Sequence, residues 1–141
     1  MVIDKELLDG LTEAAKVNPR RRMHYDLRTQ AFDEEPGWKD SSQRILNVMM
    51  ADTVIPIHRH SETSETVIVL KGRGDEVFYD TEGHETDRFT IDADSMSRMV
   101  QVPRNVYHTF IPHEDGTVIF ESKDRAYDPE ETEEFLEVKE E

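Results

Sequence analysis

The chain contains no cysteine among its 141 residues. This absence excludes disulfides, thiolate zinc sites, iron–sulfur clusters and cysteine nucleophiles, so any metal must be held by nitrogen and oxygen ligands. Long hydrophobic runs are also absent, because the longest, Thr66–Leu70, is far shorter than the roughly 20 residues of a membrane helix. The first ten residues carry early acids and no apolar region followed by a cleavage site. We therefore expect a cytoplasmic protein with no membrane partner.

Positive charge is scarce, with 17 basic against 32 acidic residues and a formal net charge of −15. Nucleic acid is therefore not an expected partner, because phosphate contacts need lysine and arginine. The one basic cluster consists of Arg20, Arg21, Arg22 and Arg28. It either binds an anion or forms a solvated face that pairs with the protein's own carboxylates. The sequence also lacks the Gly-x-Ser-x-Gly, phosphate-loop and dinucleotide-loop motifs, which excludes nucleotide-loop chemistry.

The length is that of one domain, which we expect over residues 1–128, followed by an acidic tail at 129–141. Residues 4–17 predict an amphipathic helix, with Asp4 as N-cap and apolar residues at helical spacing. From residue 22 onward, about eight short runs of β-branched and aromatic residues are separated by turn residues. The predicted fold class is all-β: a single antiparallel barrel or double-sheet jelly roll, with the N-terminal helix before it and a short acidic C-terminal helix or tail after it.

Two histidines, His58 and His60, stand one residue apart just before the most hydrophobic segment. Alternate side chains of a strand share a face, so the two imidazoles can converge on one ion. Glu65 follows after a short connection and could aim its carboxylate at the same point, and His108 lies on a later predicted strand. These histidines are either metal ligands or hydrogen-bonded groups of the fold. In the second case they would need other polar partners.

The stretch from His58 to Gly72 resembles the first cupin motif, which reads His-x-His, three or four residues, Glu, six residues, Gly. Residues 102–112 resemble the second cupin motif, whose histidine is His108 here. The sequence departs from the two motifs at turn and strand-end positions, namely Asp52, Ser97, Asn105 and Pro112. These departures concern loop geometry and leave the ligand positions intact. The resemblance implies one metal site formed by His58, His60, Glu65 and His108.

A narrower resemblance extends over nearly the whole chain. Residues 3–27, the His-x-His segment, His108–Phe110 and residues 121–129 are similar to the WbuC-type cupin-fold metalloproteins, small bacterial proteins sometimes encoded among O-antigen genes. That family implies a metal but supplies no reaction. Many cupins pair through sheet edges, which implies a homodimer.

Three imidazoles and one carboxylate suit one divalent transition metal (Fe, Mn, Ni, Co, Cu or Zn) better than magnesium or calcium. Four protein ligands leave two positions of an octahedron for water, a bidentate substrate or dioxygen. We therefore expect action on a small polar metabolite, with a sugar derivative as one option and an isomerase, epimerase or oxygenase step. The alternative is a non-catalytic module that contains a metal and binds or senses a small ligand. A third alternative is a metal-free structural histidine cluster.

Strand alternation also suggests which side chains line the interior. The pocket candidates are Phe110, which shares the face of His108, Met99 and Gln101, which alternate with two valines, and His24 on an early strand. The core is expected to include Val67, Val69, Phe78, Phe89, Ile91, Val100, Val102 and Phe120.

Overall fold

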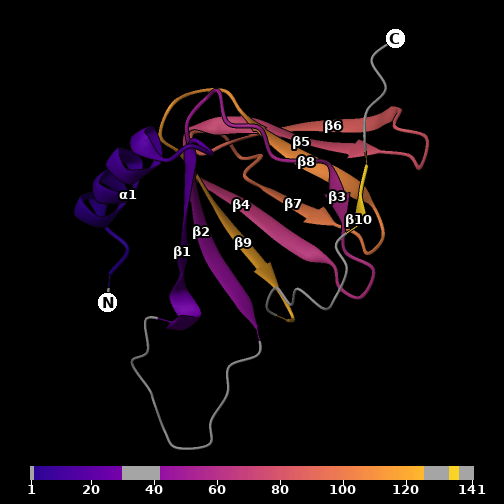
Figure 1. Ribbon diagram of the computed structural model, residues 1–141, viewed down its shortest axis with the longest axis horizontal. Helices are drawn as coiled ribbons and strands as arrows, with labels where there is room; N and C mark the ends of the chain where they lie inside the picture. The colour runs from indigo at the N-terminus through magenta and orange to yellow at the C-terminus, as the bar shows by residue number, and fades with distance from the viewer. Residues whose placement is uncertain (1, 30–41, 126–133, 137–141) are drawn as a thin grey trace, which may run out of the picture.

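The computed structural model describes residues 2–29, 42–125 and 134–136, and its strands form two five-stranded antiparallel sheets (Figure 1). The first sheet contains, in spatial order, β1 (Arg22–Asp26), β2 (Gln43–Met49), β9 (Thr117–Lys123), β4 (Glu65–Lys71) and β7 (Met99–Val102). The second contains β10 (Glu134–Phe135), β3 (His58–Arg59), β8 (Tyr107–Pro112), β5 (Arg73–Tyr79) and β6 (Glu85–Asp92). A short 3₁₀ helix, η1 (Leu27–Thr29), follows β1. The predicted all-β double-sheet class is confirmed.

The closed form of the predicted barrel is wrong. Among the described strands, no edge strand of one sheet pairs with an edge strand of the other. Closure would require continuous hydrogen bonding around the barrel, but two of the four edge strands, β7 and β10, have only four and two residues. Short edge strands leave too few backbone groups to join the sheets. The molecule is therefore an open sandwich with a core between the sheets.

The N-terminal helix, α1 (Lys5–Val17), forms where the sequence predicts it. The side chain of Asp4 caps the helix by accepting a hydrogen bond of 3.0 Å from the backbone N–H of Leu7. Leu11 packs with Val48 and Val118 on the outer face of the first sheet. That sheet is therefore buried on both faces near the helix. No helix in the described ranges is long and apolar enough to cross a membrane.

The central core joins the inner faces of the two sheets. Its buried members are Met49, Val67, Val69, Phe78, Ile91, Val102, Phe110 and Ile119. Five of the predicted core residues are among them, and Val100 packs against the cluster from a half-buried position. Phe89 does not belong to it, because β6 is an edge strand and leaves this side chain 41% exposed. Phe120 follows Ile119 on β9, so its side chain lies on the opposite face of the sheet, where it pairs with Leu46.

The C-terminal acidic segment forms a strand where the structure describes it, and the predicted short helix is wrong there. Glu134 pairs with Arg59 and Phe135 pairs with His58, so β10 lies beside β3 (Figure 1). The backbone N–H of Leu136 donates a hydrogen bond of 2.9 Å to the carbonyl of Ile57. The free edge of β3 supplies these partners, which the local sequence could not indicate. The rest of the predicted tail, 129–133 and 137–141, lies outside the described residues.

Candidate metal centre

Three histidines from the second sheet converge at one point. His58 and His108 are directly opposite each other on β3 and β8, and their ring centroids are 4.4 Å apart. His60 follows β3, with its ring centroid 5.0 Å from that of His58 and 5.6 Å from that of His108. Each ring offers one nitrogen, and the three nitrogens lie within 4.8 Å of one another. The cluster therefore has the dimensions of a three-histidine metal site.

Backbone carbonyls orient two of the rings. The Nδ1 atom of His58 lies 2.8 Å from the carbonyl oxygen of Pro56, and that of His108 lies 2.9 Å from the carbonyl oxygen of Val106. A carbonyl can only accept, so in each neutral ring the hydrogen is on Nδ1 and the lone pair is on Nε2. Burial, followed by repulsion from His58, lowers the pKa of His108 to about 4. His108 is therefore neutral near pH 7, as a ligand must be.

The Nε2 atom of His108 is buried and has no hydrogen-bond partner in the described part of the chain. A buried polar atom without a partner is costly, because the water it loses is not replaced. An ion at the centre of the cluster would supply the missing interaction.

Glu65 approaches the same point from the first sheet. It begins β4, and its carboxylate lies 3.4 Å from Nε2 of His60 and 3.8 Å from Nε2 of His108. Burial alone would raise the pKa of Glu65, but its hydrogen bond with His60, followed by electrostatic interaction with the histidine cluster, outweighs burial and lowers it. The candidate site is therefore held between the two sheets, with three nitrogens from one and a carboxylate from the other.

A left-handed turn fixes the approach to β8. Asn105 has φ of 68°, a conformation that asparagine tolerates better than most residues. Its backbone N–H donates a hydrogen bond of 2.8 Å to the carbonyl of His60. Asparagine therefore permits the turn at this position, where the sequence departs from the second cupin motif. The same turn links the strand of His108 to the loop of His60.

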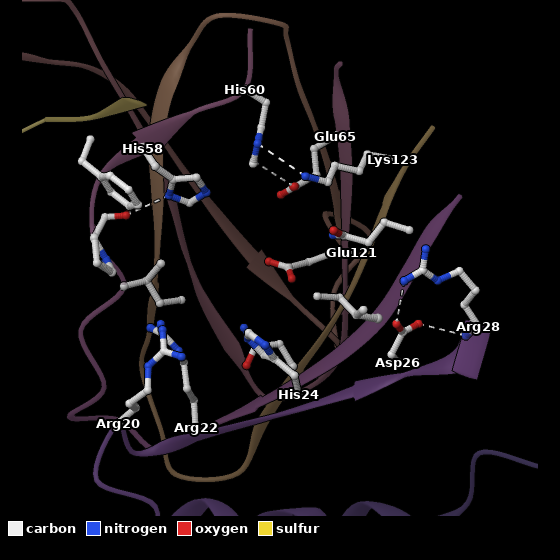
Figure 2. Close-up of a pocket in the computed structure, with 16 residues that line it drawn as sticks. Arg20, Arg22, His24, Asp26, Arg28, His58, His60, Glu65, Glu121 and Lys123 are labelled. Atoms are coloured by element: carbon white, nitrogen blue, oxygen red, sulfur yellow. Dashed lines mark hydrogen bonds and ion pairs between the residues drawn. The ribbon is translucent and has the colours of Figure 1, made fainter. Parts of the chain in front are cut away.

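A cavity of about 660 Å³ extends from the histidines to β1 (Figure 2). His58, His60 and Glu65 lie at one side of it, and Arg20, Arg22 and His24 lie at the other. Its polar lining also includes Asp26, Arg28, Gln43, Asn47, Glu121 and Lys123. The candidate metal centre is thus one end of a polar cavity large enough for a small molecule.

The structure places the four pocket candidates differently from one another. His24 lines the cavity. Met99 and Gln101 point away from it, because Val100 and Val102 take the inner face of β7, and Met99 is 61% exposed. Phe110 faces the interior but is buried in the core against Gly74. These last three are not among the residues that line this cavity.

Two charged residues of β9 line the cavity although the sequence did not indicate them as pocket residues. Glu121 and Lys123 share the inner face with Ile119, and Figure 2 shows the carboxylate of Glu121 directed into the cavity. The Nζ atom of Lys123 lies 3.5 Å from Nδ1 of His60. The alternation of side chains along the strand places Glu121 and Lys123 on the same face as Ile119, but the sequence does not indicate that this face is the inner one.

Comparison with known proteins gives one family match, over residues 3–91, to a family described as "Domain of unknown function (DUF6016)". This range includes His58, His60 and Glu65 but not His108. No curated protein matches.

Solved structures share the fold. The capsular polysaccharide assembling protein CapF from Staphylococcus aureus is 22% identical with a TM-score of 0.67, over 86% of this chain and 33% of CapF. The 3'-monoepimerase ChmJ from Streptomyces bikiniensis, solved with dTDP-quinovose, is 17% identical with a TM-score of 0.57, over 64% of this chain and 50% of ChmJ. Bacillus subtilis oxalate decarboxylase, as its E162A mutant, is 12% identical with a TM-score of 0.54, over 70% of this chain and 25% of the enzyme. The chain has the cupin fold and spans half or less of each of these proteins.

Proposed function

The chain belongs to the family described as a domain of unknown function (DUF6016), and we propose that it is a metalloprotein that holds one divalent transition metal ion between its two sheets. The proposed ligands are His58, His60, His108 and Glu65. The observation that carries the proposal is the convergence of three imidazole nitrogens to within 4.8 Å of one another. The resemblance of the sequence to the WbuC-type metalloproteins supports the same assignment.

The donor set fits such an ion. Neutral imidazole nitrogens suit manganese, iron, cobalt, nickel, copper and zinc, whereas magnesium and calcium prefer oxygen ligands. The rings of His58 and His108 already present Nε2 toward the cluster, because their Nδ1 atoms are bonded to carbonyls. When bound, the ion would supply Lewis acidity toward an oxygen of a small molecule in the cavity.

The cavity supports action on a small polar metabolite. Its volume of about 660 Å³ lies in the usual range for ligand sites, and most of its charged side chains are not used by the metal. The carboxylate of Glu121 is directed into the cavity, where it would serve as the general base (Figure 2). This favours a reaction over binding alone, because proton transfer needs a base within reach of the substrate. An isomerase or epimerase step on a sugar derivative and an oxygenase step are both consistent with these groups.

Elemental analysis and thermal unfolding with and without chelator test the proposal. An ion that binds only the folded state at about 100 times its dissociation constant stabilises it by roughly 2.7 kcal/mol. Wild-type protein should therefore carry metal and melt at a lower temperature after chelation. His58→Ala and His108→Ala should lose the metal and should melt at the same temperature with and without chelator.

His84→Ala is the matched control, because this histidine is 63% exposed in the turn between β5 and β6. It should retain the metal and the response to chelator. The proposal fails if wild-type protein carries no metal, takes up none of the six ions named above and melts identically with and without chelator.

A further inference from the structure

Two arginines at one wall of the cavity have no carboxylate partner among the described residues. Arg22 begins β1 and is only 8% exposed. Its Nη1 donates a hydrogen bond of 3.1 Å to the carbonyl of Val54, and its Nε is buried without a partner. Arg20 makes no side-chain hydrogen bond or ion pair within the described ranges. A buried arginine without an opposite charge is rare, because removing a charge from water is costly.

The lack of a partner is not caused by a shortage of carboxylates. The chain has 32 acidic residues, and neighbouring arginines use them: Arg21 lies 3.0 Å from Asp52, and Arg28 lies 3.3 Å from Asp26. Arg22 in particular stands apart, because burial and then repulsion from Arg20 lower its pKa, and only Glu121 acts in the opposite direction. The fold therefore keeps two like charges together at a cost.

The wall that carries the two arginines is electropositive. His24 lies on the same wall, and its pKa is lowered first by burial and then by repulsion from Arg22 and Arg20. Of the three carboxylates that line the cavity, Asp26 is paired with Arg28, and Glu65 lies at the histidine cluster. Glu121 is the third. The lining has four basic side chains, Arg20, Arg22, Arg28 and Lys123, against these three carboxylates, so the cavity attracts anions.

We propose that Arg20 and Arg22 bind the oxyanion, a carboxylate or a phosphate, of a small molecule that occupies this cavity. Guanidinium groups suit this task, because their planar donors match both anions with paired hydrogen bonds. Figure 2 shows the two side chains facing the cavity beside each other, across from His60 and Glu65. The inference rests on the proposed function in that it assigns a substrate class to the same cavity.

Calorimetric titration of metal-loaded and chelator-treated protein tests the inference, with inorganic phosphate, glucuronate and glucose 6-phosphate as anionic probes and glucose as the neutral control. At least one anion should bind wild-type protein, glucose should not, and added salt should weaken the binding because it screens charge. The carboxylate and phosphate arms show which oxyanion is preferred. Arg20→Gln and Arg22→Gln should each weaken binding about tenfold or more, because each removes a charge-assisted hydrogen bond.

Arg73→Gln removes the same charge from β5, outside the cavity, and should bind the anion as wild type does. If Arg22→Gln fails to fold, anion binding by Arg20→Gln provides the test, because Arg20 is exposed. The inference is overturned if no anion binds wild-type protein, or if Arg20→Gln binds as tightly as wild type. Metal content is measured on every sample. A wild-type protein that binds the anion but never a metal would refute the proposed function and uphold this inference.

Discussion

Glu76 should make the free energy of unfolding decrease as the pH rises above about 4.3. This residue lies on β5, is 1% exposed, and has no hydrogen-bond partner for either carboxylate oxygen among the described residues. Burial, and then repulsion from Glu65 and Glu121, raise its pKa well above the usual range. The folded protein therefore keeps a proton on Glu76 that the unfolded chain releases near pH 4.3.

The sign and the slope follow from that difference. Because the folded state binds the proton more tightly, the stability linked to this group is complete below about pH 4.3 and decreases as the pH rises toward the raised folded pKa. One such group changes the free energy of unfolding by about 1.4 kcal/mol per pH unit. With 141 residues, the entropy of unfolding is about 0.3 kcal/mol/K, so each unit should lower the melting temperature by about 4–5 °C.

Glu76→Gln isolates this contribution, because the amide has nearly the same shape and cannot ionise. Melting temperatures measured by circular dichroism from about pH 4.5 upward, with chelator present throughout, should show the variant gaining on wild type as the pH rises. Glu62→Gln, at an exposed glutamate, should run parallel to wild type. Parallel curves for Glu76→Gln and wild type would show that Glu76 holds no such proton.

Two further predictions concern the fold. Asp75 is buried and accepts a hydrogen bond of 2.8 Å from Arg88. Burial would raise the pKa of Asp75, but its hydrogen bonds lower it. Asp75→Asn should therefore reduce the free energy of unfolding by about 1–3 kcal/mol at pH 7 and by progressively less below about pH 4, and an unchanged urea midpoint at pH 7 would contradict this. A Cβ at Gly74 would lie 2.4 Å from Cζ of Phe110, whereas one at Gly10 in α1 meets nothing within 4 Å. Gly74→Ala should therefore lower the melting temperature by the equivalent of about 1–3 kcal/mol and Gly10→Ala raise it by about 0.5–1 kcal/mol, and shifts of the same sign would be inconsistent with this packing.

Local patterns predicted the elements of the fold better than their assembly. The helix was identifiable because its cap and its apolar spacing lie within one segment, Asp4 to Val17. The absence of barrel closure could not be predicted, since closure depends on whether edge strands far apart in the sequence pair. The exposure of Phe89 and the strand at Glu134–Phe135 have the same origin, because each depends on which strand lies alongside.

The candidate site shows the same division. The His-x-His spacing and the second histidine motif indicated the residues that the structure brings together at the cluster. Glu121 was missed because β9 is buried on both faces, with Val118 under α1 and Ile119 in the central core. Apolar side chains on both faces hide the alternation that would have assigned Glu121 to the interior. Only the position of the helix distinguishes the two faces.

The placement of β9 also has a kinetic consequence. This strand lies between β2 and β4 in the first sheet, although it follows both of them in the chain. The sheet therefore cannot grow from successive hairpins, and a long loop must be closed before its central contacts form. Until β9 arrives, β2 and β4 each present an open edge that another chain could extend. Slow refolding and losses to aggregation at high protein concentration are the expected cost of carrying Glu121 and Lys123 on a strand that must insert between two others.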